Sequence, residues 1–198
     1  MPKSVAYRNI ATMCVLAGFE DPKEVYKKSK LVFEDYRVAL VYFKQSDIHI
    51  GTPDEVDAER RQLRFDLLDL FWRPFDEYKV QMKALVDRAM ATIWFKGLLD
   101  SATEMMLMYE RGTQYKKILD NYYFHVNPKS KTKTDRMYDC GFKTTSVFYD
   151  WLEEAVTLFG IEAWIHLKNN EYRDIAKGIV PYHDIFPDNQ KNDFGTRK

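Results

Sequence analysis

The chain has 198 residues, of which 45% are apolar and 15% aromatic, enough to build a core for one domain or two small ones. Its 30 basic and 30 acidic side chains cancel, so the chain as a whole is not a polycation that would coat nucleic acid or anionic membrane. Only Cys14 and Cys140 are present, without a CxxC pair, so neither a disulfide framework nor a zinc ribbon is indicated.

The N-terminal stretch predicts no targeting or membrane segment. "VAYRNIATMCVLAGF" is apolar, but Arg8 and Asn9 interrupt it. No uninterrupted apolar run approaches the roughly 20 residues that span a bilayer. Because two isolated cysteines also fit a reducing compartment, we expect a soluble, cytoplasmic protein with no membrane partner.

The first strong helix signal follows that stretch. Asp21 is placed as an N-cap, Pro22 occupies the first helical position, and Glu24 stands three residues after the cap. Apolar residues then recur near helical spacing through "VYKKSKLVFEDYRVALVYF". This pattern predicts one long helix.

A second long helix repeats the same device. Thr52, Pro53 and Glu55 form its predicted start. Because proline removes a backbone donor and clashes with the preceding turn, Pro74 should end or kink this helix near Trp72.

A third helical region is expected from about Asp76 to Asp100. Ser101 and Glu104 then offer another capping box, and Gly112 is expected to stop the helix that follows. Strand signals are almost absent, since the alternation in "SDIHIG" is too short to carry weight. The predicted class is all-α.

The last third of the chain has the order of a helix-turn-helix. "TQYKKILDNYYF" predicts a helix, "TKTDRMYDCG" a short helix with Met137 inward, and Gly141 the tight turn before "TTSVFYDWLEEAVTLF". We therefore expect an N-terminal helical region (residues 1–112), a helix-turn-helix-like module (113–178) and an extended or disordered tail (179–198). Tyr182 and Phe186 are the expected anchors of that tail.

The last predicted helix separates into two faces. The residues expected to face the core are Val147, Phe148, Leu152, Ala155 and Phe159. The residues expected to reach DNA are Lys143, Thr144, Thr145, Ser146 and Tyr149. The helix N-terminus would add a favourable potential for a phosphate.

Positive charge gathers beside this helix. Residues 113–149 carry 7 basic and 3 acidic side chains, whereas residues 46–110 carry 8 basic and 13 acidic ones. Lys129, Lys131 and Lys133 alternate along a proline-containing loop, with Arg136 just beyond, and we expect these four to hold a phosphate backbone. A solvated loop is the alternative interpretation of such a lysine run.

The segment "CGFKTTSVFYDWLEEAVTLF" resembles the C-terminal part of the ArpU-type phage transcriptional regulators, whose helix-turn-helix is akin to region four of sigma factors. The matching features are Gly141, the hydroxyl-rich turn at 144–146, the paired aromatics Phe148 and Tyr149, and then Ala155 and Phe159. The resemblance covers about 45 residues, mainly within 113–160. It implies sequence-directed binding of double-stranded DNA in transcriptional control, as a homodimer or with RNA polymerase or another protein as partner.

The sequence departs from that family in its acidic residues. Asp150, Glu153 and Glu154 stand where family members usually continue the recognition helix with basic residues. Because phosphates repel carboxylates, either this face turns away from DNA or the module binds protein. The second interpretation is a non-enzymatic phage helical protein that interacts with another protein in a structural, packaging or anti-defence role.

Catalysis is not expected. The four histidines, at 49, 125, 166 and 183, are scattered, and no Glu-x-x-His or His-Glu-x-x-His pattern is present. The sequence also contains no glycine-rich phosphate-binding loop. We expect no cofactor and no bound metal.

Overall fold

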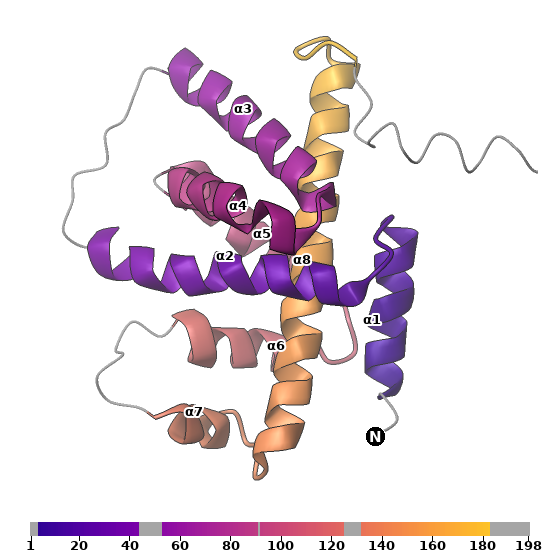
Figure 1. Ribbon diagram of the computed structural model, residues 1–198, viewed down its shortest axis with the longest axis vertical. Coiled ribbons are helices and arrows are strands. Elements are labelled where there is room, and N and C mark those ends of the chain that lie inside the picture. Colours follow the sequence, from indigo (N-terminus) through magenta and orange to yellow (C-terminus); the bar gives the residue numbers. More distant parts are fainter. Residues whose placement is uncertain (1–3, 44–52, 91, 125–131, 183–198) are drawn as a thin grey trace, which may run out of the picture.

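The computed structural model describes residues 4–43, 53–90, 92–124 and 132–182, and within these ranges it consists of helices without a strand (Figure 1). The helices, in chain order, are α1 (Val5–Leu16), α2 (Pro22–Phe43), α3 (Pro53–Trp72), α4 (Phe75–Met90), α5 (Ile93–Met106), α6 (Gly112–Leu119), the π-helical turn η1 (Asp120–Phe124), α7 (Lys133–Asp139) and α8 (Thr145–Ala176). The predicted all-α class is confirmed. The weak strand signal at 46–51 lies outside the described residues.

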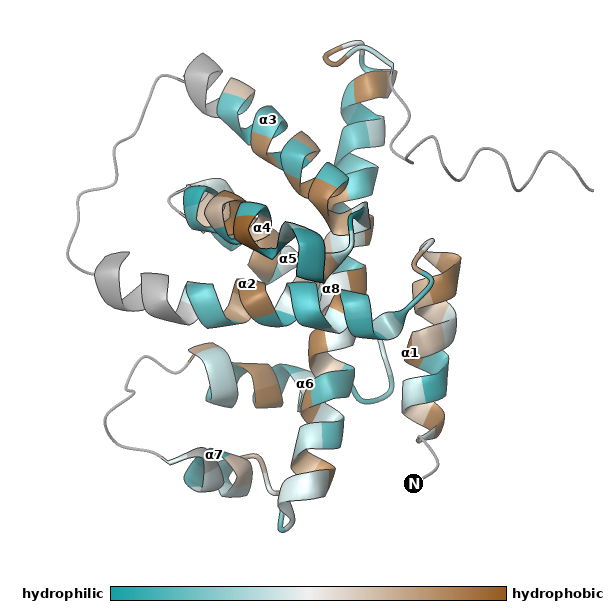
Figure 2. Ribbon diagram, in the orientation of Figure 1, coloured by the Kyte–Doolittle hydropathy of each residue, from teal (hydrophilic) through white to brown (hydrophobic). Residues whose placement is uncertain are grey.

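Helix α8 is the centre of the fold. It is 32 residues long, and α1, α2, α3, α5, α6 and α7 all pack against it. Residues 154–164 are buried without interruption, as expected of a helix that is covered on every side. In Figure 1, α2 crosses α8 and α1 lies beside it, while Figure 2 shows apolar residues along the middle of α8 and hydrophilic ones in its upper turns.

The buried side chains form one hydrophobic cluster. It includes residues from α1, α2 and α4 on one side of the expected boundary at residue 112, and from α6, α7 and α8 on the other. The expected regions 1–112 and 113–178 therefore contribute to one core. Tyr182, an expected anchor of the tail, is 78% exposed, and Phe186 lies outside the described residues.

The start of α2 follows the prediction in part. The Lys23 amide donates to Asp21 Oδ1 at 2.9 Å, so Asp21 caps the helix as expected. Glu24 has a different role: its Oε2 accepts from the Phe75 amide at 2.7 Å, at the first residue of α4. The carboxylate thus satisfies an amide at the start of another helix, a pairing that only the tertiary fold creates.

The corner between α3 and α4 is held by the same turn of α2. Helix α3 ends at Trp72, two residues before Pro74, as predicted. Lys28 Nζ donates to the Phe71 carbonyl oxygen at 2.5 Å and lies over the Phe71 ring. An ammonium at a helix carboxyl end interacts favourably with the unpaired carbonyl groups there.

The α2–α8 crossing depends on small residues. A Cβ atom added to Gly160 would lie 2.0 Å from Ser29 Oγ and 2.7 Å from Val25 Cγ1. Glycine therefore lets the two helices approach closely.

The middle of the chain differs from the prediction at three points. The region expected to be one helix breaks before Thr92, whose Oγ1 accepts from the Phe95 amide at 3.3 Å and starts α5. Ser101 lies inside α5 and does not start a helix. Gly112 begins α6 instead of ending a helix. A Cβ there would lie 1.9 Å from the Met106 carbonyl oxygen, so only glycine fits this approach.

Candidate nucleic-acid interface

The α7–turn–α8 segment begins at the predicted residues, but α8 continues to Ala176, well beyond the predicted end at Phe159. Thr132 and Asp135 form a capping box at the start of α7, with the Asp135 amide donating to Thr132 Oγ1 at 3.2 Å and the Thr132 amide donating to Asp135 Oδ2 at 2.8 Å. Met137 is buried, as expected. Gly141 takes a φ of +87°, a left-handed conformation that glycine adopts without strain, and α8 begins four residues later.

The first two turns of α8 have one exposed face and one buried face. The five residues expected to reach DNA are all exposed: Lys143, Thr144, Thr145, Ser146 and Tyr149. Of the residues expected to face the core, four are buried: Phe148, Leu152, Ala155 and Phe159. Val147 is the error, with 45% of its surface exposed. Successive helical residues point about 100° apart, so Val147 cannot share the inward direction of Phe148.

Aromatic contacts hold this end of α8 in place. The Phe148 ring lies 5.5 Å from that of Phe142 in the turn and 5.8 Å from that of Tyr122 in η1. The Tyr149 ring is 6.5 Å from the Tyr122 ring. Burial and a side-chain hydrogen bond with Tyr149 raise the pKa of Tyr122 to about 12. These ring contacts fix the exposed first turns of α8 to η1 and to the preceding turn.

The acidic residues of α8 do not share one face. Glu154 is only 2% exposed and accepts hydrogen bonds from the Ser4 hydroxyl and, at 2.7 Å, from the Tyr115 hydroxyl. Arg111 Nη1 lies 3.2 Å from the same carboxylate. Glu153 is half-buried, whereas Asp150 is exposed. One of the three carboxylates that depart from the family pattern thus belongs to the core.

The basic residues expected to hold phosphates have different outcomes. Lys129 and Lys131 lie outside the described residues, and of Lys133 only the backbone, at the start of α7, is described. Arg136 corrects the prediction: it is 6% exposed, and its Nη1 donates to the Tyr122 carbonyl oxygen at 2.9 Å. Its guanidinium joins α7 to η1 and is not presented to a ligand.

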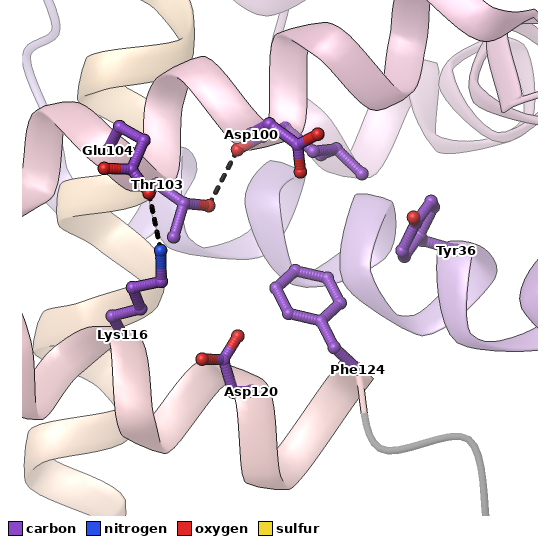
Figure 3. Close-up of a pocket in the computed structure, with 8 residues that line it drawn as sticks. Tyr36, Asp100, Thr103, Glu104, Lys116, Asp120 and Phe124 are labelled. Carbon is purple, nitrogen blue, oxygen red and sulfur yellow. Dashed lines mark hydrogen bonds and ion pairs between the residues drawn. The ribbon is translucent and has the colours of Figure 1, made fainter.

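A pocket of about 320 Å³ lies elsewhere, between α2, α5, α6 and η1 (Figure 3). Phe124 and Tyr36 lie toward one end and Lys116 toward the other, and the lining also includes the carboxylates of Asp100, Glu104 and Asp120. Two of these carboxylates already have partners, since Lys116 lies 2.6 Å from Glu104 and Lys96 lies 2.6 Å from Asp100. The Thr103 hydroxyl also has a partner, since it donates to the Leu99 carbonyl oxygen at 2.7 Å.

The described residues also lack a candidate metal centre. They contain no group of three or more His, Cys, Asp or Glu residues placed to hold an ion. His166 is half-buried, and burial together with nearby Arg173 lowers its pKa. The other three histidines, at 49, 125 and 183, lie outside the described residues.

None of the helices, as far as the structure describes them, combines the length and the apolar character needed to cross a membrane. Comparison of the chain with family models, with curated proteins and with solved structures finds no match. The exposed end of α8 is thus the feature of the described residues that best suits a ligand.

Proposed function

We propose that this protein binds double-stranded DNA through the amino-terminal end of α8 and acts in phage transcriptional control. The observation that carries the proposal is the exposure of Lys143, the three hydroxyl residues 144–146 and Tyr149, at the end of α8 and in the turn before it. Buried Phe148 fixes this end of α8 to the core. Residues of this kind hydrogen-bond to base edges and phosphates. The regulatory role is what the family resemblance implies.

The dimensions suit a major groove. An α-helix with its side chains is about 10–12 Å in diameter, and the major groove is about 12 Å wide, so the end of α8 can enter it. Thr144, the N-cap residue, makes no side-chain capping hydrogen bond, which leaves its hydroxyl available to a ligand. The first amides of a helix also carry partial positive charge that favours a phosphate.

The lysine-rich loop supplies the second part of the proposed mechanism. Lys129, Lys131 and Lys133 would contact the phosphate backbone, independently of sequence, while the end of α8 samples base edges. Arg136 is left out of this set because its guanidinium is buried.

The test is binding to a fluorescent pool of random duplexes over a salt series. Wild type is compared with Lys143→Glu and with the double variant Lys131→Ala, Lys133→Ala. Lys23→Glu is the matched control, because Lys23 is exposed near the start of α2 and undergoes the same charge reversal next to a helix N-terminus. We expect affinity to fall with salt in wild type and control, to collapse in Lys143→Glu, and to show a smaller salt slope in the double variant.

A protein-binding function is the second candidate. It is favoured by exposed apolar surface at the same end of the molecule, where Tyr138, Val147 and Tyr149 are 58%, 45% and 40% exposed. Aromatic side chains are enriched in protein interfaces. Absence of duplex binding at low salt by folded wild type would refute the DNA proposal and leave this alternative.

A further inference from the structure

Asp150 is exposed at the end of α8 that is proposed above to contact DNA. It lies two residues after buried Phe148 and two before buried Leu152, about 200° of helical rotation from each, and so faces away from the core. Ser146, four residues earlier, shares this outward face. The centre of the exposed face thus carries a hydroxyl followed by a carboxylate.

Glu154, one helical turn after Asp150, has hydrogen-bond and ion-pair partners within the chain. Glu154 receives hydrogen bonds from Ser4 and Tyr115 and an ion pair from Arg111. Among the residues that the structure describes, Asp150 has no hydrogen bond or ion pair. Its oxygens are therefore available to a donor outside the chain.

The base edges of a major groove offer a donor that suits it. Phosphates and the N7, O6 and O4 atoms of bases are acceptors and repel a carboxylate, whereas the amino groups of cytosine (N4) and adenine (N6) donate. Adenine N6 lies beside the acceptor N7 of the same base, which repels a carboxylate, so cytosine N4 is the usual partner of Asp and Glu. We propose that Asp150 is a specificity-determining residue that selects cytosine by accepting a hydrogen bond from N4. This inference rests on the DNA-binding function proposed above, and it makes the acidic residue part of recognition.

The proposal predicts opposite effects on affinity and on selectivity. Asp150→Ala removes a charge that phosphates repel, so the affinity for random duplexes should rise a few-fold. Sequencing of duplexes enriched from the random pool should show that a preference for one C·G pair, present with wild type, is lost. Asp150→Asn should shift that preference to A·T, because an amide pairs with the N6 and N7 atoms of adenine.

A double-mutant cycle between protein and DNA provides the decisive measurement. Replacing the preferred C·G pair by T·A should weaken wild type by about 5- to 150-fold, the range expected for loss of one base contact. The same replacement should leave Asp150→Ala nearly unchanged. Glu59→Gln is the control for net charge, because it also removes one exposed negative charge. Glu59 lies on α3, which contacts the carboxyl end of α8 through the Arg64–Glu171 pair, at the opposite end of α8 from Asp150.

The outcomes separate this inference from the function on which it rests. If wild type binds duplexes with a sequence preference but the two changes are additive, Asp150 does not read cytosine and the DNA-binding function stands. If Asp150→Ala keeps the wild-type preference, the inference is likewise overturned, because alanine has no acceptor for N4. If folded wild type binds no duplex at low salt, both fail. Because Asp150 is exposed, circular dichroism of each variant should match that of wild type.

Discussion

Two glycines provide a direct test of the α2–α8 crossing, because alanine has room at one and not at the other. Gly97 lies inside α5 with no atom within 4 Å of an added Cβ, whereas a Cβ at Gly160 in α8 would lie 2.0 Å from Ser29 Oγ and 2.7 Å from Val25 Cγ1. Both glycines are in helix interiors, so alanine gains about 0.5–1 kcal/mol of helix preference at each. This common gain cancels in the comparison.

The difference between the two variants measures the cost of the clash. Ser29 and Val25 are almost fully buried, and Ser29 Oγ is fixed by a 2.8 Å hydrogen bond to the Val25 carbonyl oxygen, so neither side chain can move aside freely. Extra methyl groups in a packed core cost about 1–3 kcal/mol. We expect the unfolding free energy of Gly97→Ala to exceed that of wild type by about 0.5–1 kcal/mol, and that of Gly160→Ala to lie about 1–3 kcal/mol below that of Gly97→Ala.

Urea denaturation followed by circular dichroism and tryptophan fluorescence gives both free energies. Adding Ser29→Ala to Gly160→Ala removes the nearest atom and should recover part of the loss, giving a coupling energy above about 0.5 kcal/mol. Equal stability of the two alanine variants would show that α2 and α8 do not pack in this way.

Two further predictions concern buried charge. Burial lowers the pKa of Lys28 from 10.5 to about 8, so the unfolded chain holds one more proton between these pH values and the Lys28 contribution to stability rises with pH there. The unfolding free energy of wild type relative to Lys28→Met should therefore rise by about 3 kcal/mol from pH 8 to 10.5, and a flat difference in urea titrations across this range would contradict the burial of the ammonium. Arg64 lies 2.5 Å from Glu171 and 2.7 Å from Asp174, all three being buried. Arg64→Ala should lower the unfolding free energy by about 3–5 kcal/mol, whereas Arg73→Ala, which removes an exposed pair with Asp69, should cost under about 1 kcal/mol; similar losses for the two would refute the buried network.

Local signals in the sequence predicted the elements well where the deciding contacts are near in the chain. Asp21 caps α2, Pro74 follows the end of α3, and Gly141 forms the turn before α8. Each of these depends on backbone preferences and on hydrogen bonds over a few residues. The break at Thr92 is equally local, and its cap was hidden by apolar residues that continue the helical pattern on both sides.

The predictions that are wrong concern the direction in which a side chain points. Arg136 was expected at a phosphate and instead bonds the Tyr122 carbonyl oxygen, because η1 lies beside α7. Val147 was placed in the core, although the neighbouring Phe148 takes that direction. Helical spacing could have excluded Val147, since Phe148, Leu152, Ala155 and Phe159 already recur on one face, whereas nothing local indicates that the Arg136 guanidinium would meet a carbonyl group of η1.

The amino-acid sequence by itself determined that the chain is helical, where several helices start and end, and which polar residues cluster before α8. Only the tertiary structure decided which acidic residues of α8 remain outside. Glu154 is taken into the core by Ser4, which lies 150 residues earlier in the chain, together with Tyr115 and Arg111, whereas Asp150 meets no such donors among the described residues. The physical reason is that a carboxylate can be buried only where the fold brings donors to it, and those donors come from helices far away in sequence.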